Sequence, residues 1–454
     1  MDIILLAECA VKDAISKGCD EAEVFIKTAK RLSVEVKNNG VEALNSAKDF
    51  GISLRVIKKH RLGFSFTTNP AELEDMIKEA VEGAKWTAED EYIDIPNPLL
   101  PPSDVLVFDE KIKNIKEDDI INNALFLEKA ALDFDSRIKK VRKAEVSIAE
   151  GSTAIFNSKG INISYESSFV TAAVTTLADD GYDMQTGWDF AVSRRLSDIN
   201  FSSIAAAASK KAIDLLGSRK ITSVKVPVIL DSSVASDFLG IFSSSLSAEA
   251  VQKKRSFLAN KIGKNIISPI VNIFDDGLMP WRIGTKPVDD EGVPTSKKMI
   301  VSKGALTGFI HNTYTAKKEG TVSTGNAVRG DFKSLPGVGV TNLYIEPKIR
   351  HQSSDFRQQT EIQNDNLVKS LSKGILVLEA MGVHTANPIS GDFSVGVSGL
   401  WIENGEIKYP VKEAVISGNV LELFKRIESV GSDLKFYGKI GSPSLLIGEM
   451  DISA

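Results

Sequence analysis

The chain has 454 residues, a formal net charge of −5 and a pI near 5.7. This length predicts two or three domains, and a content of 43% apolar and 25% charged residues is that of ordinary soluble globular proteins. The acidic balance argues against direct binding to nucleic acid or to an anionic membrane surface. No segment carries the roughly eighteen uncharged apolar residues that span a bilayer.

The N-terminus and the cysteines indicate where the protein works. Asp2 stands where a secretory signal peptide would carry positive charge. The two cysteines, Cys9 and Cys19, lie in and just after the first predicted helix, about 15 Å apart if that helix continues, which is too far for a disulfide. We therefore expect a cytoplasmic protein.

The first predicted unit, residues 1–95, consists of a helix, β-rich runs and a second helix. Asn69 and Pro70 supply the N-cap and the first residue of the second helix. The β-rich runs are Ala22–Thr28, Leu32–Lys37, Ile52–Ile57 and Leu62–Thr67. Prolines within residues 95–104 then exclude a helix or a central strand, so we expect a linker there.

The second predicted unit, residues 106–220, repeats this order of elements. A helix near 116–134 and a closing helix over Ser197–Leu216 flank the β-rich runs. These runs are Lys143–Ile148, Thr153–Asn157, Ile161–Glu166 and Val170–Leu177. The repeated order predicts an internal duplication of a helix, β-sheet, helix unit.

The remaining residues, 221–454, are rich in glycine and in short alternating runs. They predict a mostly β domain, a barrel or a sandwich, with a few helices such as Asn419–Ser429. The whole chain is therefore predicted to be an α+β protein. The opening helix of this domain has an apolar stripe at Phe238, Ile241, Phe242 and Leu246, beside a run of serines.

The usual catalytic motifs are missing. The four histidines, His60, His311, His351 and His384, are far apart, and no HExxH pair, GxSxG elbow or phosphate-binding loop occurs. The acidic runs 275–277 and 289–292 both end in glycine, which favours turns over cation sites. A carboxylate metal site at Asp275, Asp289 and Asp392 remains an alternative.

A polar, glycine-rich stretch covers residues 381–411. We predict that four of its side chains line a ligand groove: His384, Asn387, Asp392 and Ser394. The simpler alternative is a pair of strands with Trp401 in the core and a hairpin turn over residues 403–406.

Several long motifs resemble one known family. They are VDDEGVPT (288–295), KGALTGFIHNTYTAKKEG (303–320), STGNAVRG (323–330), ISGDFSVGVSGLWIENGEIKYPV (389–411) and AVISGNVLELFKRIESVGSD (414–433). Together they resemble the TldD/PmbA family, and its PmbA (TldE) branch in particular. The resemblance implies a cytoplasmic peptidase of two related chains, once described as a modulator of DNA gyrase, which degrades unfolded peptides and trims peptide-antibiotic precursors.

The resemblance also implies where a metal would lie. TldD-type chains carry an HExxxH zinc motif on the helix that opens the C-terminal domain, with a cysteine near the C-terminus as a further ligand. The matching positions here are Leu239, Gly240, Ser244 and Ser442. Since leucine and glycine cannot bind zinc and serine binds it poorly, we expect no catalytic residues and no metal in this chain, and zinc only in a TldD-type partner.

Two functions remain open. The first is a non-catalytic subunit that pairs with a TldD-type zinc chain and helps form a chamber for unfolded peptides. The second is a stand-alone homodimer that binds peptides or another ligand without cleaving them. In either case we expect an interface in the C-terminal domain, on the alternating runs Val338–Tyr344, Gly374–Glu379 and Ser394–Ile402.

Overall fold

The computed structural model describes residues 3–98, 100–348 and 366–453. Helices account for 24% and strands for 41% of the chain, so the predicted α+β class is confirmed. Among the described residues, no helix is long and apolar enough to cross a lipid bilayer.

The N-terminal half forms one six-stranded antiparallel sheet in the order β3-β2-β1-β4-β5-β6. Its first part consists of α1 (Ile3–Ser16), β1 (Glu21–Lys37), β2 (Gly40–Lys58), β3 (Arg61–Thr67), η1 (Pro70–Glu72) and α2 (Leu73–Gly83). Its second part consists of η2 (Glu110–Asn114), α3 (Glu117–Leu132), β4 (Ile138–Asn157), β5 (Asn162–Asp179), β6 (Met184–Ser193), η3 (Leu196–Asp198) and α4 (Phe201–Asp214). The predicted order of helix, strands and helix is confirmed in both parts, which join edge to edge through β1 and β4.

The strands are longer than the sequence predicted. The separate runs before and after Ala29–Arg31 are one strand, β1, because its backbone pairs with β2 on one side and β4 on the other. Strand β6 was missed because its pattern is inverted. Trp188 is 43% exposed, whereas Asp189 is buried and paired with Lys435.

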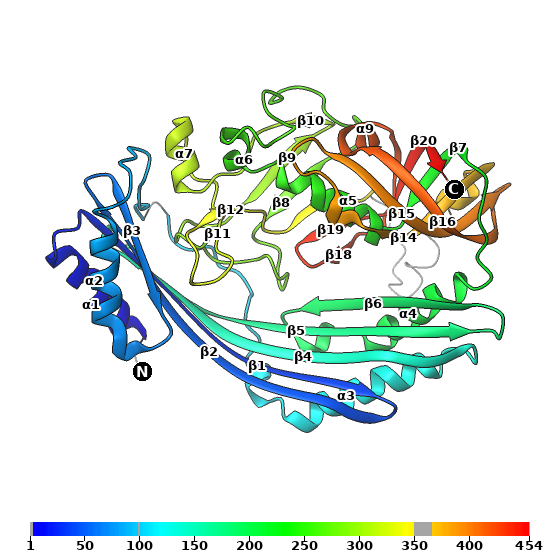
Figure 1. Ribbon diagram of the computed structural model, residues 1–454, viewed down its shortest axis with the longest axis horizontal. Coiled ribbons are helices and arrows are strands. Elements are labelled where there is room, and N and C mark those ends of the chain that lie inside the picture. The colour runs from blue at the N-terminus through cyan, green and yellow to red at the C-terminus, as the bar shows by residue number, and fades with distance from the viewer. Residues whose placement is uncertain (1–2, 99, 349–365, 454) are drawn as a thin grey trace.

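The helices and the C-terminal domain lie on opposite faces of the sheet. Helices α3 and α4 cover the lower face in Figure 1, and their apolar residues form one core with the end of β1, the first half of β4 and the second half of β5. Helices α1 and α2 cover the other end of the sheet. The sheet curves beneath the C-terminal domain, which therefore contacts its upper face.

The C-terminal domain is mostly β. Its elements up to β13 are β7 (Val224–Leu230), α5 (Ser232–Ser244), α6 (Ala248–Gln252), β8 (Ile273–Asp276), β9 (Lys297–Ser302), β10 (Ala305–Leu306), α7 (Thr313–Glu319), β11 (Ala327–Val328), β12 (Gly337–Val338) and β13 (Leu343–Ile345). The remaining elements are β14 (Lys373–Met381), η4 (Val383–Thr385), β15 (Asp392–Glu403), β16 (Glu406–Asn419), α9 (Val420–Lys425), β17 (Ile427–Val430), β18 (Lys435–Tyr437), β19 (Ile440–Ser442) and β20 (Leu445–Ser453).

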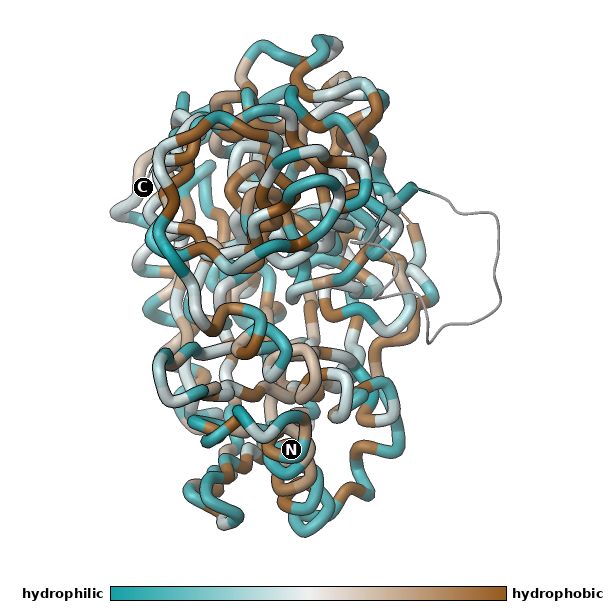
Figure 2. The backbone as a smooth tube through the Cα atoms, turned by 90° about the vertical axis from the view of Figure 1, so that its right-hand side faces the viewer, coloured by the Kyte–Doolittle hydropathy of each residue, from teal (hydrophilic) through white to brown (hydrophobic). Residues whose placement is uncertain are grey.

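Of the two predicted arrangements, the barrel is found. Strands β16, β15, β14, β7 and β20 follow one another, and pairing of β16 with β20 closes them into a five-stranded barrel. Hydrophobic and hydrophilic segments alternate along the chain of this domain in Figure 2, as expected for strands with one buried face. A second sheet, in the order β10-β9-β8-β13-β19-β18, lies beside the barrel.

One local prediction for this domain needs correction. The predicted helix Asn419–Ser429 is the short helix α9 followed by strand β17. The runs Gly374–Glu379 and Ser394–Ile402 lie in the barrel strands β14 and β15, where Ile375, Val377 and Val395 are at most 1% exposed. The run Val338–Tyr344 lies outside the barrel, and an interface on these runs stays a prediction. The hairpin turn over residues 403–406 is present, and Trp401 is buried.

Candidate functional site

Helix α5, which opens the C-terminal domain, is embedded in that domain. The Asp231 side chain caps its start by accepting a hydrogen bond from the backbone N–H of Ser233. The helix packs against β14, β18 and β19. Phe238 lies 4.8 Å from the ring of Phe393, centroid to centroid, which anchors the apolar face of the helix in the core.

The four positions predicted to match metal ligands lie on this helix and on the strand beside it. The Leu239 side chain is fully buried in the apolar core, and Gly240 is partly exposed. Ser244 is exposed and donates a hydrogen bond of 2.8 Å to the carbonyl of Ile241. Ser442 is fully buried and donates to the carbonyl of Pro443. The correspondence with a relative's ligands itself stays a prediction.

Titratable groups that the sequence did not single out surround α5 on the side of the N-terminal sheet. Desolvation raises the pKa of Asp237, on α5, to about 6, although Lys211 of α4 opposes the shift. Desolvation likewise raises the pKa of Glu379, on β14, against the same lysine. No motif marks these residues, because they come together only when α4 meets the C-terminal domain.

Polar and aromatic contacts fix this meeting of the two regions. Lys435 of β18 pairs with the buried Asp189 of β6 at 2.9 Å. The ring of Tyr437 lies 5.8 Å from that of Phe190, and its hydroxyl lies 3.4 Å from the Ser232 hydroxyl. Helix α5 therefore lies on the side of the C-terminal domain that meets β6, as Figure 1 shows.

The four residues predicted to line a groove are all exposed and lie beyond the end of α5. His384 is in η4, and Asn387 accepts hydrogen bonds from the backbone N–H groups of Ile389 and Ser390. Asp392 accepts hydrogen bonds from Ser390 and Asn419, whereas Ser394 follows on β15. The structure thus accounts for two of these side chains as turn-forming groups, and ligand binding by the four stays a prediction.

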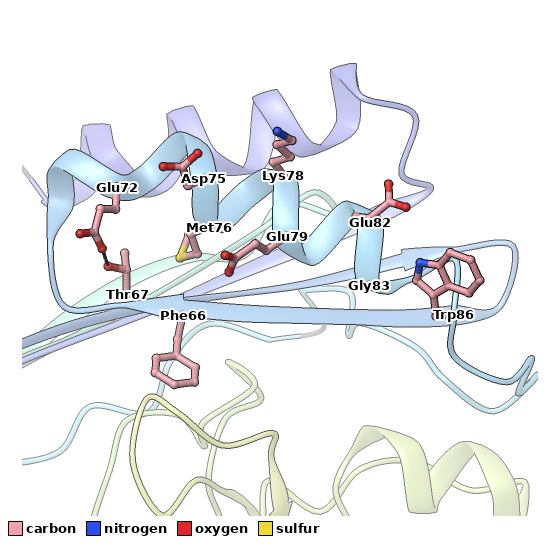
Figure 3. Close-up of a pocket in the computed structure, with 10 residues that line it drawn as sticks. All are labelled: Phe66, Thr67, Glu72, Asp75, Met76, Lys78, Glu79, Glu82, Gly83 and Trp86. Atoms are coloured by element: carbon pink, nitrogen blue, oxygen red, sulfur yellow. Dashed lines mark hydrogen bonds between the residues drawn. The ribbon is translucent and has the colours of Figure 1, made fainter.

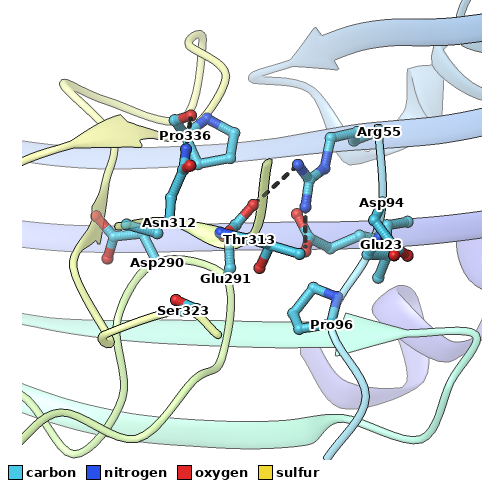
Figure 4. A network of polar contacts seen from close by, with 12 residues as sticks. Glu23, Arg55, Asp94, Pro96, Asp290, Glu291, Asn312, Thr313, Ser323 and Pro336 are labelled. Atoms are coloured by element: carbon cyan, nitrogen blue, oxygen red, sulfur yellow. Dashed lines mark hydrogen bonds and ion pairs between the residues drawn. The ribbon is translucent and has the colours of Figure 1, made fainter. Parts of the chain in front are cut away.

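A buried ion network joins the N-terminal sheet to the C-terminal domain (Figure 4). Arg55 of β2 contacts Glu23 of β1 at 2.8 Å and Glu291 of the C-terminal domain at 3.0 Å. Arg329 contacts Glu23 at 2.6 Å. All four side chains are at most 6% exposed. Two carboxylates and two guanidinium groups balance one another, which offsets the cost of burying each charge.

Electrostatics in this network act differently on the two arginines: the pKa of Arg55 is raised, whereas burial lowers the pKa of Arg329. Burial alone would lower the pKa of Arg55, but the carboxylates of Glu23 and Glu291 raise it above its ordinary value. Glu291 also accepts a hydrogen bond from the backbone N–H of Thr313 at 2.8 Å. The sequence analysis treated residues 289–292 only as a turn and missed this role, because Arg55 lies 236 positions away in the chain.

The acidic runs do form turns. Asp289 accepts hydrogen bonds from the N–H groups of Glu291 and Val293, and Asp290 pairs with Lys286 at 2.6 Å. Asp275 accepts hydrogen bonds from Thr341 and Asn326. In the part of the chain that the structure describes, no three metal-binding side chains cluster, so the alternative site at Asp275, Asp289 and Asp392 is not assembled.

The histidines are also dispersed. His60 occupies a tight turn with a φ of 56°, and His311 is buried, which lowers its pKa. His384 is exposed, and His351 lies outside the described residues.

A separate acidic groove runs between α2 and β3 (Figure 3). It is lined by Phe66, Thr67, Glu72, Asp75, Met76, Lys78, Glu79, Glu82, Gly83 and Trp86. Two of its carboxylates are hydrogen-bonded, Glu72 by Thr67 and Glu79 by Ser65. Trp86 is 82% exposed at one end. The groove lies at the opposite end of the sheet from β6.

The fold, a curved sheet of duplicated pattern under a barrel domain, and its likeness to known proteins define a class of protein related to metallopeptidases. Three family models match the chain: the PmbA/TldA metallopeptidase domain 1 over residues 22–84, the central domain over 110–216 and the C-terminal domain over 223–454. The chain therefore belongs to the PmbA/TldD family.

Individual relatives agree with this assignment. The chain is 28% identical to the metalloprotease PmbA of Escherichia coli O157:H7, over 99% of this chain and 96% of that protein. A Thermotoga maritima structure, described as a proposed modulator of a DNA gyrase, matches with a TM-score of 0.89, 27% identity and 99% coverage of both chains. TldE of Thermococcus kodakarensis has the same fold, with a TM-score of 0.88, 22% identity and coverage of 99% of this chain and 100% of that one.

Proposed function

We propose that this chain is the non-catalytic subunit of a TldD/TldE-type peptidase, which pairs with a zinc-bearing TldD-type chain and helps enclose unfolded peptides. The observation that carries the proposal is the donor set on α5 and β19. Leu239 and Gly240 offer no metal-binding atom, and the hydroxyls of Ser244 and Ser442 donate to backbone carbonyls. These residues do not fit a zinc ion, which needs imidazole, thiolate or carboxylate ligands.

In this proposal the chain contributes a polar surface on α5 that contacts the peptide. The exposed side of α5, with Asp237 and the neighbouring Glu379, lies between the barrel and α4, where Lys211 faces both carboxylates. Such a surface can hold a peptide by its backbone and its basic side chains, while the bond-breaking chemistry belongs to the partner. Zinc is accordingly expected in the partner and not in this chain.

The test is a peptidase assay on three samples: this chain, a TldD-type chain from the same organism, and their mixture. We expect cleavage of a disordered peptide only by the mixture, with loss of activity on adding a chelator. Cleavage by this chain alone would contradict the proposal. A chain that never binds the TldD-type chain, yet binds disordered peptides without cleaving them, would favour the stand-alone binding protein instead.

A further inference from the structure

The outer edge of β2 is an uncovered part of the N-terminal sheet. Strand β3 pairs with β2 only from Ile52 to Lys58, and no described strand pairs with the outer side of residues 40–51. Nearly every residue from Val41 to Asp49 is exposed, including Leu44 at 38% and Val41 at 46%. An open edge with exposed apolar side chains is a template for a further strand.

The peptide groups of this edge are oriented to form hydrogen bonds with a further strand. Lys58 pairs with Arg61 across a two-residue turn, and the pair that closes such a hairpin is hydrogen-bonded. Lys58 therefore turns its N–H and C=O toward β3, and alternate residues do the same along the strand. The register with β1 is regular down to Ala43, so the same alternation continues along β2. The backbone N–H and C=O groups of Leu44, Ser46 and Lys48 therefore point to the open edge.

The side chains of the edge are complementary to themselves. In an antiparallel pair of two copies with the two-fold axis at Asn45, position 42 of each copy comes opposite Lys48 of the other. Glu42 is the extra residue of the bulge in β2, and its long side chain reaches across to that lysine. Ala43 then lies opposite Ala47, and the two Leu44 side chains become diagonal neighbours on one face. Shifting the register by two residues removes both ion pairs. We propose that this edge pairs with the same edge of a second copy, making one continuous sheet across the two chains.

This contact goes beyond the proposed function, because it involves neither α5 nor the barrel. The paired segments are short compared with a standard interface, so association should be weak and visible at concentrations on the order of 100 µM. Lysine on a strand edge can also serve only to block aggregation. The charge pattern favours self-pairing over blocking. A lysine that only blocks aggregation needs no glutamate placed to meet it in a second copy, whereas Glu42 is so placed for Lys48.

The first test mixes two charge variants of the full chain, Glu42→Lys and Lys48→Glu, in sedimentation at this concentration. Each variant alone faces two like-charged pairs and should be monomeric, whereas an equimolar mixture restores both ion pairs and should form mixed dimers. Glu42 also pairs with Lys37 in its own hairpin at 3.0 Å, which the mixture does not restore, so circular dichroism of each variant checks the fold. Unchanged dimers in the single variants, or no recovery in the mixture, would overturn the proposal.

The second test fixes the register by cross-linking. The exposed Cys9 is first replaced by serine, and Asn45→Cys is then introduced. At the two-fold axis the two new cysteines form a non-hydrogen-bonded pair with Cα atoms about 4.5 Å apart, which permits a disulfide. Ala47→Cys is the matched control on the same face, because its two copies lie about 13 Å apart. Equal cross-linking of both variants, or cross-linking only to a TldD-type chain, would contradict self-pairing.

Discussion

At the scale of single residues, Arg55 holds the two halves of the molecule in one orientation. It belongs to the N-terminal sheet, but one of its two carboxylate partners, Glu291, belongs to the C-terminal domain. Because the network is buried, each of its charges depends on the others. These ion pairs thus help fix the position of the sheet relative to the C-terminal domain.

Replacing Arg55 should therefore be severe. Arg55→Met leaves Glu291 without its ion-pair partner, and we expect a loss of about 3–5 kcal/mol in the free energy of unfolding. Urea denaturation measures this change. Lys253→Met, which removes an exposed pair with Glu249, is the control and should change the unfolding free energy by less than about 0.5 kcal/mol. Equal effects of the two variants would show that the buried network contributes no more than a surface pair.

Asp237 should make stability depend on pH in a defined window. Its folded pKa, about 6, exceeds the ordinary value of 3.8, so the folded chain holds a proton that the unfolded chain releases. The contribution of the protonated Asp237 carboxyl to the free energy of unfolding is fully present below pH 3.8 and is lost as the pH rises through 6. Asp237→Asn should consequently gain stability relative to the wild type between pH 4 and 7 in urea titrations, whereas the exposed Asp104→Asn supplies the baseline. A pH-independent difference between Asp237→Asn and the wild type would contradict the shift.

At the scale of elements, close packing of α2 on β3 depends on Gly63. A Cβ at this position would overlap the carbonyl oxygen of Ala80, in the helix above the strand. Gly63→Ala should thus move α2 and cost about 1–3 kcal/mol in thermal or urea unfolding. Gly83→Ala, in the same helix, meets no atom within 4 Å and should be neutral or stabilise by about 0.5–1 kcal/mol. Similar losses in both variants would refute the packing argument.

The elements also show what the sequence could and could not predict. The capped start after Asn69 and the apolar stripe of α5 were readable because they depend on neighbouring residues. The full length of β1 was not, since pairing on both sides carries the strand through polar residues. Strand β6 buries Asp189 and exposes Trp188, so its partners, not its pattern, determine it.

The same reasoning applies to the candidate site. The positions Leu239, Gly240, Ser244 and Ser442 came from a resemblance, and the structure describes what each side chain does there. The influence of Lys211 on both Asp237 and Glu379 had no local signal, because it joins distant parts of the chain. Contacts between residues so far apart in the chain can be identified only from the three-dimensional structure.

At the scale of the whole molecule, the chain has the fold of the PmbA/TldD metallopeptidase family. Its three domains match the PmbA/TldA family models, and its fold matches that of the Thermotoga maritima relative throughout. In the proposed assembly this chain supplies shape and charge around a peptide, and its partner supplies the zinc.

The position of zinc in the assembled complex tests this account most directly. Crystals of this chain with a TldD-type chain, measured on both sides of the zinc absorption edge, locate the metal by its anomalous scattering. We predict one strong peak on the opening helix of the partner's C-terminal domain and none beside Leu239, Ser244 or Ser442. A peak between α5 and β19 of this chain would contradict the account.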